Sequence, residues 1–208
     1  MIKTRSRSEL DMSQDEQTFD QWIARARTLR QQGQNKKAID AYRQALQLSP
    51  DSLEALNEMG LTHIHIGEQN EAIVAFDLAI SISDLDPRAH SNKAEAYLTL
   101  GLFEESLKAA EEGLSYAPES AELWSKKARA LESLLRIDEA VEAYNKAISF
   151  DSCDPETWKA LALCLDAQEN WAAVARAYRI AGGLHQKRGE NQDAESCFKF
   201  AEMAEKSE

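Results

Sequence analysis

The feature of this sequence that most constrains its fold is a pattern that recurs every 34 residues. Small side chains stand at this interval, and an aromatic residue stands three positions before most of them. The small residues are Ala45, Ala79, Gly113, Ala147 and Ala181, and the earlier residues are Tyr42, Phe76, Ala110, Tyr144 and Tyr178. A fixed period of this length is typical of stacked supersecondary units, each of which buries its apolar face only against its neighbours.

A second set of small residues marks the first half of each unit. It comprises Ala26, Gly60, Ala94, Ala128 and Ala162, and the residues four positions earlier are Trp22, Leu56, His90, Trp124 and Trp158. Between the two halves stand Gly33, Gly67 and Gly101, replaced by Leu135 and Glu169 in the last two units. Because a glycine after a helical run can take the left-handed conformation that ends a helix, each unit is predicted to be helix, tight turn, helix.

Residues that cap helices mark the predicted helix starts. Asp86-Pro87 and Asp154-Pro155 place an N-cap side chain directly before a proline at the first helical position. Asp51 with Glu54, and Ser13 with Glu16, have the spacing of capping boxes. We therefore expect helices to begin just after Ser13, Asp51, Asp86 and Asp154.

This pattern resembles the tetratricopeptide repeat (TPR) family, which has Trp, Leu-Gly, Tyr, Ala, Phe, Ala and Pro at fixed positions of a 34-residue unit. Five units are in register over residues 13–188, namely 19–52, 53–86, 87–120, 121–154 and 155–188. The resemblance implies an all-α, right-handed solenoid of about five helix-turn-helix units.

The two ends of the chain depart from the period. After Ala181 the next small residue of this kind is Ala201, so we expect the last long helix to run to about Arg188, followed by a capping helix and tail over 189–208. Gly182-Gly183 leaves open whether that long helix is broken. Residues 1–12 carry Ser, Arg, Lys and Glu without a period and are expected to form a disordered tail.

Charge and cysteine content limit the partners and the compartment. The formal net charge of −12 disfavours binding to nucleic acid, whose phosphates it would repel. Three cysteines without a Cys-x-x-Cys spacing indicate reduced thiols. No segment has the apolar length of a signal peptide core or a membrane span. We therefore expect a soluble, cytoplasmic protein without membrane insertion.

The sequence offers no pattern for catalysis or for a cofactor. His63 and His65 are two residues apart, so on a helix they point in different directions and do not chelate one metal ion. By register, His63 and His90 fill aromatic positions and are expected to pack between helices, whereas His65 is expected on the inner face. No nucleophile, phosphate-loop or zinc motif is present, so we expect neither an enzyme nor a metal or cofactor site.

The resemblance also implies a binding surface, because TPR proteins hold a partner's peptide or helix in a concave groove lined by the first helix of each unit. Carried onto this chain, the groove residues are Arg27, Arg30, Asn57, Leu61, Ile64, His65, Arg88, Asn92, Leu98, Lys126, Arg129 and Lys159. Leu163 adds to the apolar floor. A chaperone-tail clamp, which needs a set of Lys and Asn residues, is matched only by Asn92 and Lys126 and is disfavoured.

The predicted function is a protein-interaction adaptor that binds a protein or peptide ligand in this groove, as a monomer. The alternative is a structural subunit that self-associates as a homo-oligomer or joins an obligate complex through its convex face or end helix. Charge reversal at Lys126 and Arg129 is expected to weaken partner capture and to leave helicity and melting unchanged.

Overall fold

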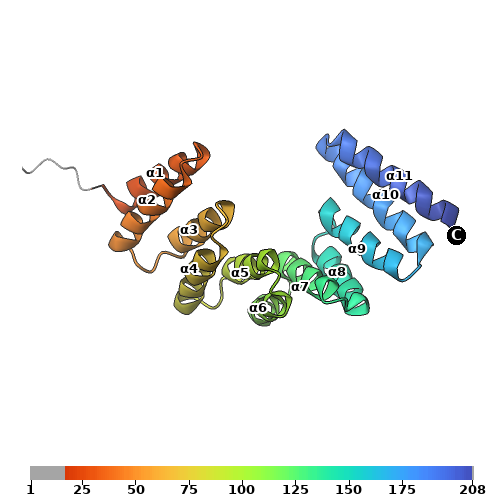
Figure 1. Cartoon of the computed structure of the whole chain (residues 1–208), viewed down its shortest axis with the longest axis horizontal. Helices are drawn as coiled ribbons and strands as arrows, with labels where there is room; N and C mark the ends of the chain where they lie inside the picture. The colour runs from red at the N-terminus through yellow and green to blue at the C-terminus, as the bar shows by residue number, and fades with distance from the viewer. Residues whose placement is uncertain (1–16, 208) are drawn as a thin grey trace, which may run out of the picture.

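The computed structural model describes residues 17–207, which form eleven α-helices and no strand (Figure 1). In chain order they are α1 (Phe19–Gln31), α2 (Asn35–Leu48), α3 (Leu53–His65), α4 (Gln69–Ile82), α5 (Pro87–Leu100), α6 (Phe103–Tyr116), α7 (Ala121–Ser133), α8 (Ile137–Phe150), α9 (Pro155–Ala167), α10 (Trp171–Arg188) and α11 (Asn191–Ser207). The predicted tail, residues 1–12, and the predicted capping pair, Ser13 and Glu16, lie outside the residues that the structure describes.

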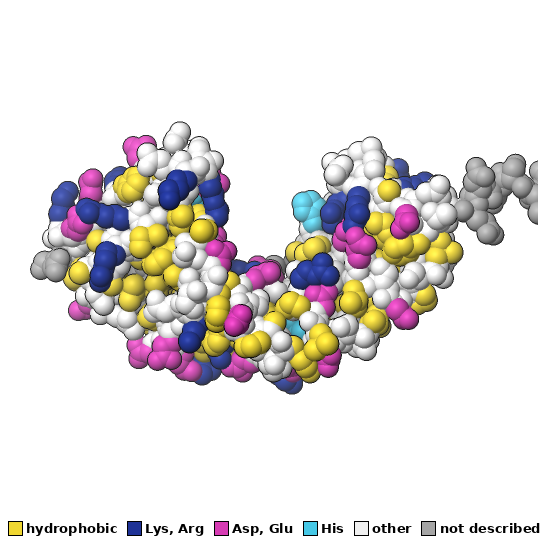
Figure 2. All heavy atoms as spheres, turned by 180° about the vertical axis from the view of Figure 1, so that it is seen from behind, with side chains coloured by type: hydrophobic (Ala, Val, Ile, Leu, Met, Phe, Trp, Pro, Cys, Tyr) yellow, Lys and Arg dark blue, Asp and Glu magenta, His cyan; other side chains and the backbone are white. Residues whose placement is uncertain are grey.

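Each odd-numbered helix from α1 to α9 forms a hairpin with the helix that follows it, and the hairpins stack along one curved array. Figure 1 places α3, α5, α7 and α9 on the inner side of the curve and α4, α6 and α8 on the outer side. The space-filling view from behind shows the hollow between the two ends of the array (Figure 2). The predicted all-α TPR solenoid is confirmed.

The first helix of every hairpin begins at a capping side chain, and these caps follow the period of the chain. They are Thr18, Ser52, Asp86, Ser120 and Asp154, and each accepts a hydrogen bond from a backbone N–H in the first helical turn. The predicted Asp51–Glu54 box is therefore wrong by one residue, because Ser52 is the N-cap and accepts from the Ala55 N–H. Asp86-Pro87 and Asp154-Pro155 are confirmed as helix starts.

The turn within each hairpin needs one residue with a left-handed backbone. Gly33, Gly67 and Gly101 supply it with φ of 73°, 81° and 74°. Leu135 and Glu169 take the same conformation, with φ of 59° and 56°, although each has a side chain. The backbone conformation of the turn is thus the same along the array. In the fourth and fifth hairpins the left-handed residue is not glycine, so its side chain makes that conformation strained.

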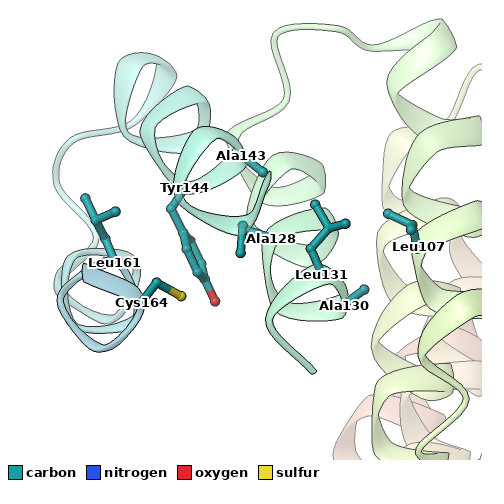
Figure 3. Close-up of a cluster of buried hydrophobic side chains, with 9 residues drawn as sticks. Leu107, Ala128, Ala130, Leu131, Ala143, Tyr144, Leu161 and Cys164 are labelled. Carbon is teal, nitrogen blue, oxygen red and sulfur yellow. The ribbon is translucent and has the colours of Figure 1, made fainter. Parts of the chain in front are cut away.

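Small residues and large aromatic residues interlock between hairpins. In the fourth hairpin the fully buried ring of Tyr144 from α8 lies between Ala128 of α7 and the α9 residues Leu161 and Cys164 (Figure 3). A Cβ built on Gly60 would collide with the ring of Phe76, so that glycine is needed for the close approach of α3 and α4. The Ala- and Gly-rich positions of the period therefore set the distance between helices.

The C-terminal end holds a sixth hairpin that overlaps the fifth. α10 runs unbroken through Gly182-Gly183 and packs along α11. Residues of the second hairpin recur here at one constant offset: Gly60, His63, Gly67, Glu68, Ala72, Phe76 and Ala79 correspond to Gly182, His185, Gly189, Glu190, Ala194, Phe198 and Ala201. A Cβ on Gly182 would lie 2.8 Å from Phe198, as Gly60 meets Phe76. The expected capping helix is therefore also the second arm of a hairpin that shares α10.

Among residues 17–207, no helix combines the length and the apolar character that crossing a lipid bilayer requires.

Candidate partner-binding surface

The concave face consists of the first helices α1, α3, α5, α7 and α9. At its N-terminal end, Arg27 of α1 is tied to two acids of α3. Its Nε donates to Glu58 Oε1 at 3.0 Å, and its Nη2 pairs with Glu54 and Glu58. The buried Tyr42 hydroxyl donates to Glu58 Oε2 at 2.6 Å. Burial works to raise the pKa of Glu58, but the hydrogen bonds from Arg27 and Tyr42 outweigh it and hold that pKa below its ordinary value.

The α3/α5 junction is closed by an amide rather than by an ion pair. Asn57 is 6% exposed, and its Nδ2 donates to Asp86 Oδ2 at 3.2 Å. Asp86 is also the N-cap of α5, and it accepts from the backbone and the guanidinium of Arg88. These bonds outweigh burial and lower the pKa of Asp86. The prediction that Asn57 lines the groove is thus corrected, because its side chain is buried and hydrogen-bonded to Asp86 of the next hairpin.

The α5/α7 junction is closed by an acid that receives two cations. Lys126 Nζ and Arg129 Nη1 lie 2.8 Å and 2.5 Å from Glu95 Oε2, and Ser91 donates to Glu122 at 2.6 Å. Burial opposes ionisation of Glu95, yet the two cations lower its pKa. Charge reversal at Lys126 and Arg129 would gather acids around Glu95, so the expectation that such a variant melts unchanged is withdrawn.

Within residues 17–207, no side-chain hydrogen bond or ion pair joins the first helices α7 and α9, although Gln168 after α9 donates to Asp138 of α8 at 2.6 Å. Ala160 of α9 holds the repeat position that is Glu58 in α3 and Lys126 in α7, and its methyl group offers no hydrogen-bond acceptor to Arg129. Arg129 instead turns back to Glu95 of α5. A cavity of about 410 Å³ lies between α7 and α9 and is lined by Arg129, Ala160 and neighbouring polar groups. We call it the α7/α9 cavity.

Further polar groups line this cavity and a smaller one of about 250 Å³ beside it. Glu132 of α7 accepts a hydrogen bond of 2.6 Å from the Tyr144 hydroxyl, and burial together with this bond raises the pKa of Tyr144. Lys126 and Thr157 line both cavities. The α7/α9 junction therefore offers cations, acids and a hollow at one place on the concave face.

The apolar residues predicted for the groove differ in exposure. Leu61 and the added Leu163 are exposed, on α3 and α9. Ile64 is half-buried against the cluster around Phe76, and Leu98 is half-buried against the cluster around Tyr144. Of the apolar floor, Leu61 and Leu163 are thus the residues most open to a partner.

The remaining predicted groove residues are polar. His65 is exposed, and Arg30 and Asn92 are partly exposed. Arg88 is largely exposed while it pairs with Asp86, and Lys159 pairs with Glu156 of its own helix at 3.0 Å. The structure therefore brings most of the predicted cations to the concave face, but as members of ion pairs.

The histidines at aromatic positions stabilise turns and packing. His63 is buried, and its Nδ1 lies 2.8 Å from Glu68 Oε2 across the Gly67 turn. His185 repeats this contact with Glu190 at 2.6 Å across Gly189. His90 is buried against the Tyr116 ring, with ring centroids 5.9 Å apart. The expectation that His63 and His90 pack between helices is confirmed.

Within residues 17–207, one group of three side chains has metal-ligating atoms close together. It comprises His185, Glu190 and Asp193, whose ligand atoms lie within 4.8 Å of one another. The contact between His185 and Glu190 has the same place in its turn as that between His63 and Glu68. A repeated turn contact accounts for this group without an ion.

These observations define a solenoid of helix-turn-helix repeats with polar ties between its first helices. Tetratricopeptide repeat profiles match residues 53–84 and 91–156, and a TPR repeat profile matches residues 26–67. The chain belongs to the tetratricopeptide repeat family. Proteins of this fold are typically scaffolds for protein–protein interaction. No curated protein sequence matches the chain.

Three solved structures show the breadth of the fold. A thermophilic TPR protein of Thermus thermophilus has a TM-score of 0.71 and 17% identity, covering 89% of this chain and 100% of its own. A MamA protein has a TM-score of 0.68 and 20% identity, covering 83% of this chain and 94% of its own. The pilF protein of Pseudomonas aeruginosa has a TM-score of 0.67 and 16% identity, covering 86% of this chain and 88% of its own. At these identities the likeness extends to the fold alone.

Proposed function

We propose that this protein is a non-catalytic adaptor that holds a segment of a partner protein on its concave face, at the α7/α9 cavity. The observation that carries the proposal is that Ala160 stands at a repeat position where α3 and α7 have the polar side chains Glu58 and Lys126. The three junctions before it are closed by side chains, whereas this one is open and lined by Arg129 and Glu132. Exposed Leu163, one turn along α9 from Ala160, adds apolar surface beside the opening.

The chemistry of the cavity favours a polar peptide with an apolar anchor. Arg129 is partly exposed and, besides its pair with Glu95, can bind a carboxylate of the partner. Glu132 can accept a hydrogen bond from a partner's backbone amide or basic side chain. Leu163 and Leu61 would meet apolar side chains farther along the face. The partner segment is therefore expected to cross the concave face and to place a polar side chain between α7 and α9.

The test is to fill the cavity without changing charge. Ala160→Gln adds a side chain that can accept from Arg129, and Gln is a good helix former. Ala160→Ser keeps the position small and serves as the matched control. Partners would be captured from the native cell by cross-linking and identified by mass spectrometry, using wild type and both variants. We expect a partner that wild type and Ala160→Ser retain and Ala160→Gln loses; equal capture by all three would overturn the proposal.

The cytoplasm is the proposed location. The three cysteines are free thiols, and two of them, Cys164 and Cys197, are buried. Burial raises the pKa of Cys164 to about 12, so its thiol stays protonated and unreactive near neutral pH. Free thiols that serve as small apolar groups are typical of a reducing compartment.

A second candidate function, a subunit that associates through its end helix, is favoured by the outer face of α11. Phe200 and Met203 are about half exposed there. Phe200→Gln with Met203→Gln removes this apolar surface; because Phe200 also lies against the Tyr178 ring of α10, circular dichroism checks that the variant melts like wild type. Light scattering distinguishes the two functions: an adaptor is a monomer with or without these substitutions, whereas an end-to-end assembly becomes smaller when they are made.

A further inference from the structure

The outer face of α4 carries a stripe of exposed apolar side chains. Val74, Leu78 and Ile82 follow at four-residue steps, so they lie on one face of the helix. They are 60%, 49% and 40% exposed, and Leu85 in the link to α5 is 68% exposed. We call these four residues the α4 stripe. The residues that α4 buries are others, namely Ala72, Ala75, Phe76 and Ala79. The stripe is therefore not used to stack the hairpins.

The same outer positions are both polar in α2, α6 and α8, whereas α10 has Arg176 at the first and the exposed Ile180 at the second. The position of Val74 holds Asp40, Lys108 and Glu142 in α2, α6 and α8, and the position of Leu78 holds Gln44, Glu112 and Lys146. The position of Ile82 holds a large hydrophobic or aromatic residue in each of these helices, so what sets α4 apart is that Val74 and Leu78 are both apolar. Because the fold forms with polar residues at these places, their apolar character in α4 indicates contact with something outside the chain.

The charged residues of α4 itself and of the link that follows it are all acidic. α4 carries Glu71 and Asp77 and neither Lys nor Arg, and Asp84 follows it. Asp77 is neutralised by Lys93 at 2.7 Å. On α2 and α6, by contrast, outer charges pair within the helix, as in Arg43 with Asp40 and Lys108 with Glu112. The polar border of the α4 stripe is therefore acidic at both of its ends.

We infer that the α4 stripe docks an amphipathic helix of another protein, whose apolar face is bordered by Lys and Arg. A second copy of this chain would bring Glu71 and Asp84 against the same acids, and an anionic membrane would be repelled by them. From Val74 to Ile82 the stripe extends about 12 Å along the helix axis, which matches about two turns of a partner helix. The stripe lies on the convex side, so the adaptor has a second docking surface apart from its concave face.

The experiment uses the full chain and a labelled synthetic helix as probe. The peptide has Leu at alternating three- and four-residue spacing and Lys at the other positions; a second peptide has Glu in place of each Lys. Val74→Glu with Leu78→Lys gives α4 the residues of α8 and leaves the net charge unchanged. The control, Glu142→Gln with Lys146→Gln, changes the same two positions of α8. Fluorescence anisotropy measures affinity, and circular dichroism checks that each variant melts like wild type.

We expect the Leu/Lys peptide to bind wild type and the α8 control alike, and to bind the stripe variant at least about tenfold more weakly. The Leu/Glu peptide should bind none of them measurably. Equal affinity for wild type and the stripe variant overturns the inference, because binding would then depend on net charge alone. It is also overturned if light scattering shows a dimer that the stripe variant dissolves, or if vesicles containing phosphatidylserine retain wild type and release that variant.

Discussion

The α1/α3 and α7/α9 junctions have the same place in the repeat, but only the first is tied by side chains. Arg27 reaches Glu58 across α1 and α3, whereas the equivalent Arg129 of α7 faces Ala160 of α9. The backbone register is the same at both. Between these two junctions, the change from Glu58 to Ala160 accompanies the change from a joined pair of first helices to a cavity, and a repeat protein can open a binding site without altering its fold.

The largest expected effect comes from making the first junction resemble the last. Glu58→Ala places at α3 the residue that α9 has. It removes the acceptor of the buried Tyr42 hydroxyl and one of the two acids that pair with Arg27, the other being Glu54. We expect the free energy of unfolding, measured with urea, to fall by about 2 kcal/mol, because the buried hydroxyl loses its acceptor and the cation loses its more buried acid.

The control for this variant is Glu54→Ala. Glu54 also pairs with Arg27, but more than half of its side chain is exposed and Tyr42 does not bond to it. Its loss should cost less than about 0.5 kcal/mol, as is usual for an exposed ion pair. If the two variants were equally destabilised, Glu58 would not be the residue that closes the junction.

Acid should weaken the closed junctions through the same acids. The pKa values of Glu58, Asp86 and Glu95 are all lowered, and each of these residues ties two first helices together before the α7/α9 junction. A carboxyl whose pKa is lower in the folded chain stabilises it above the unfolded pKa. That stability is lost as pH falls from the ordinary glutamate value of 4.5 through the folded pKa.

Glu95→Gln isolates this effect, because the amide cannot ionise. The difference in unfolding free energy between wild type and Glu95→Gln should be largest near neutral pH and should shrink below about pH 4.5, as Glu95 is protonated. Urea unfolding followed by circular dichroism across the acid range measures it. A difference that stays constant with pH would show that the ionised form of Glu95 does not hold α5 to α7.

Much of the fold was predictable because the period fixes which faces are buried. The interlocking of Tyr144 with small residues, the left-handed Gly67 turn and the burial of His63 follow from register alone. The local Asp51–Glu54 spacing points one residue too early, whereas the shared register of Thr18, Ser52 and Ser120 indicates the cap at Ser52. The sixth hairpin was missed because sharing α10 shortens its interval.

The candidate site was less predictable, since ion pairs depend on which side chains meet across a junction. The sequence predicts Arg27, Lys126 and Arg129 as contacts for a partner, but in the structure they pair with acids of their own chain. A sequence signal did exist, because Arg27 precedes Glu58 by the same interval by which Glu95 precedes Lys126. Ala160 at the next such position indicates the open junction.

The smallest expected effect concerns the turns, which also differ between the two ends of the array. Leu135 holds φ at 59° where the first three hairpins have glycine, and it is 83% exposed, so its side chain packs against little. Leu135→Gly should raise the free energy of unfolding by about 0.5 kcal/mol, because relief of left-handed strain exceeds the added freedom of the unfolded chain. Gly101→Ala is the mirror control. Its φ of 74° strains any side chain while nothing lies within 4 Å of the added Cβ, so urea unfolding should show a loss of about 1 kcal/mol. A loss of stability in both variants would mean that Leu135 is held by contacts rather than tolerated in the turn.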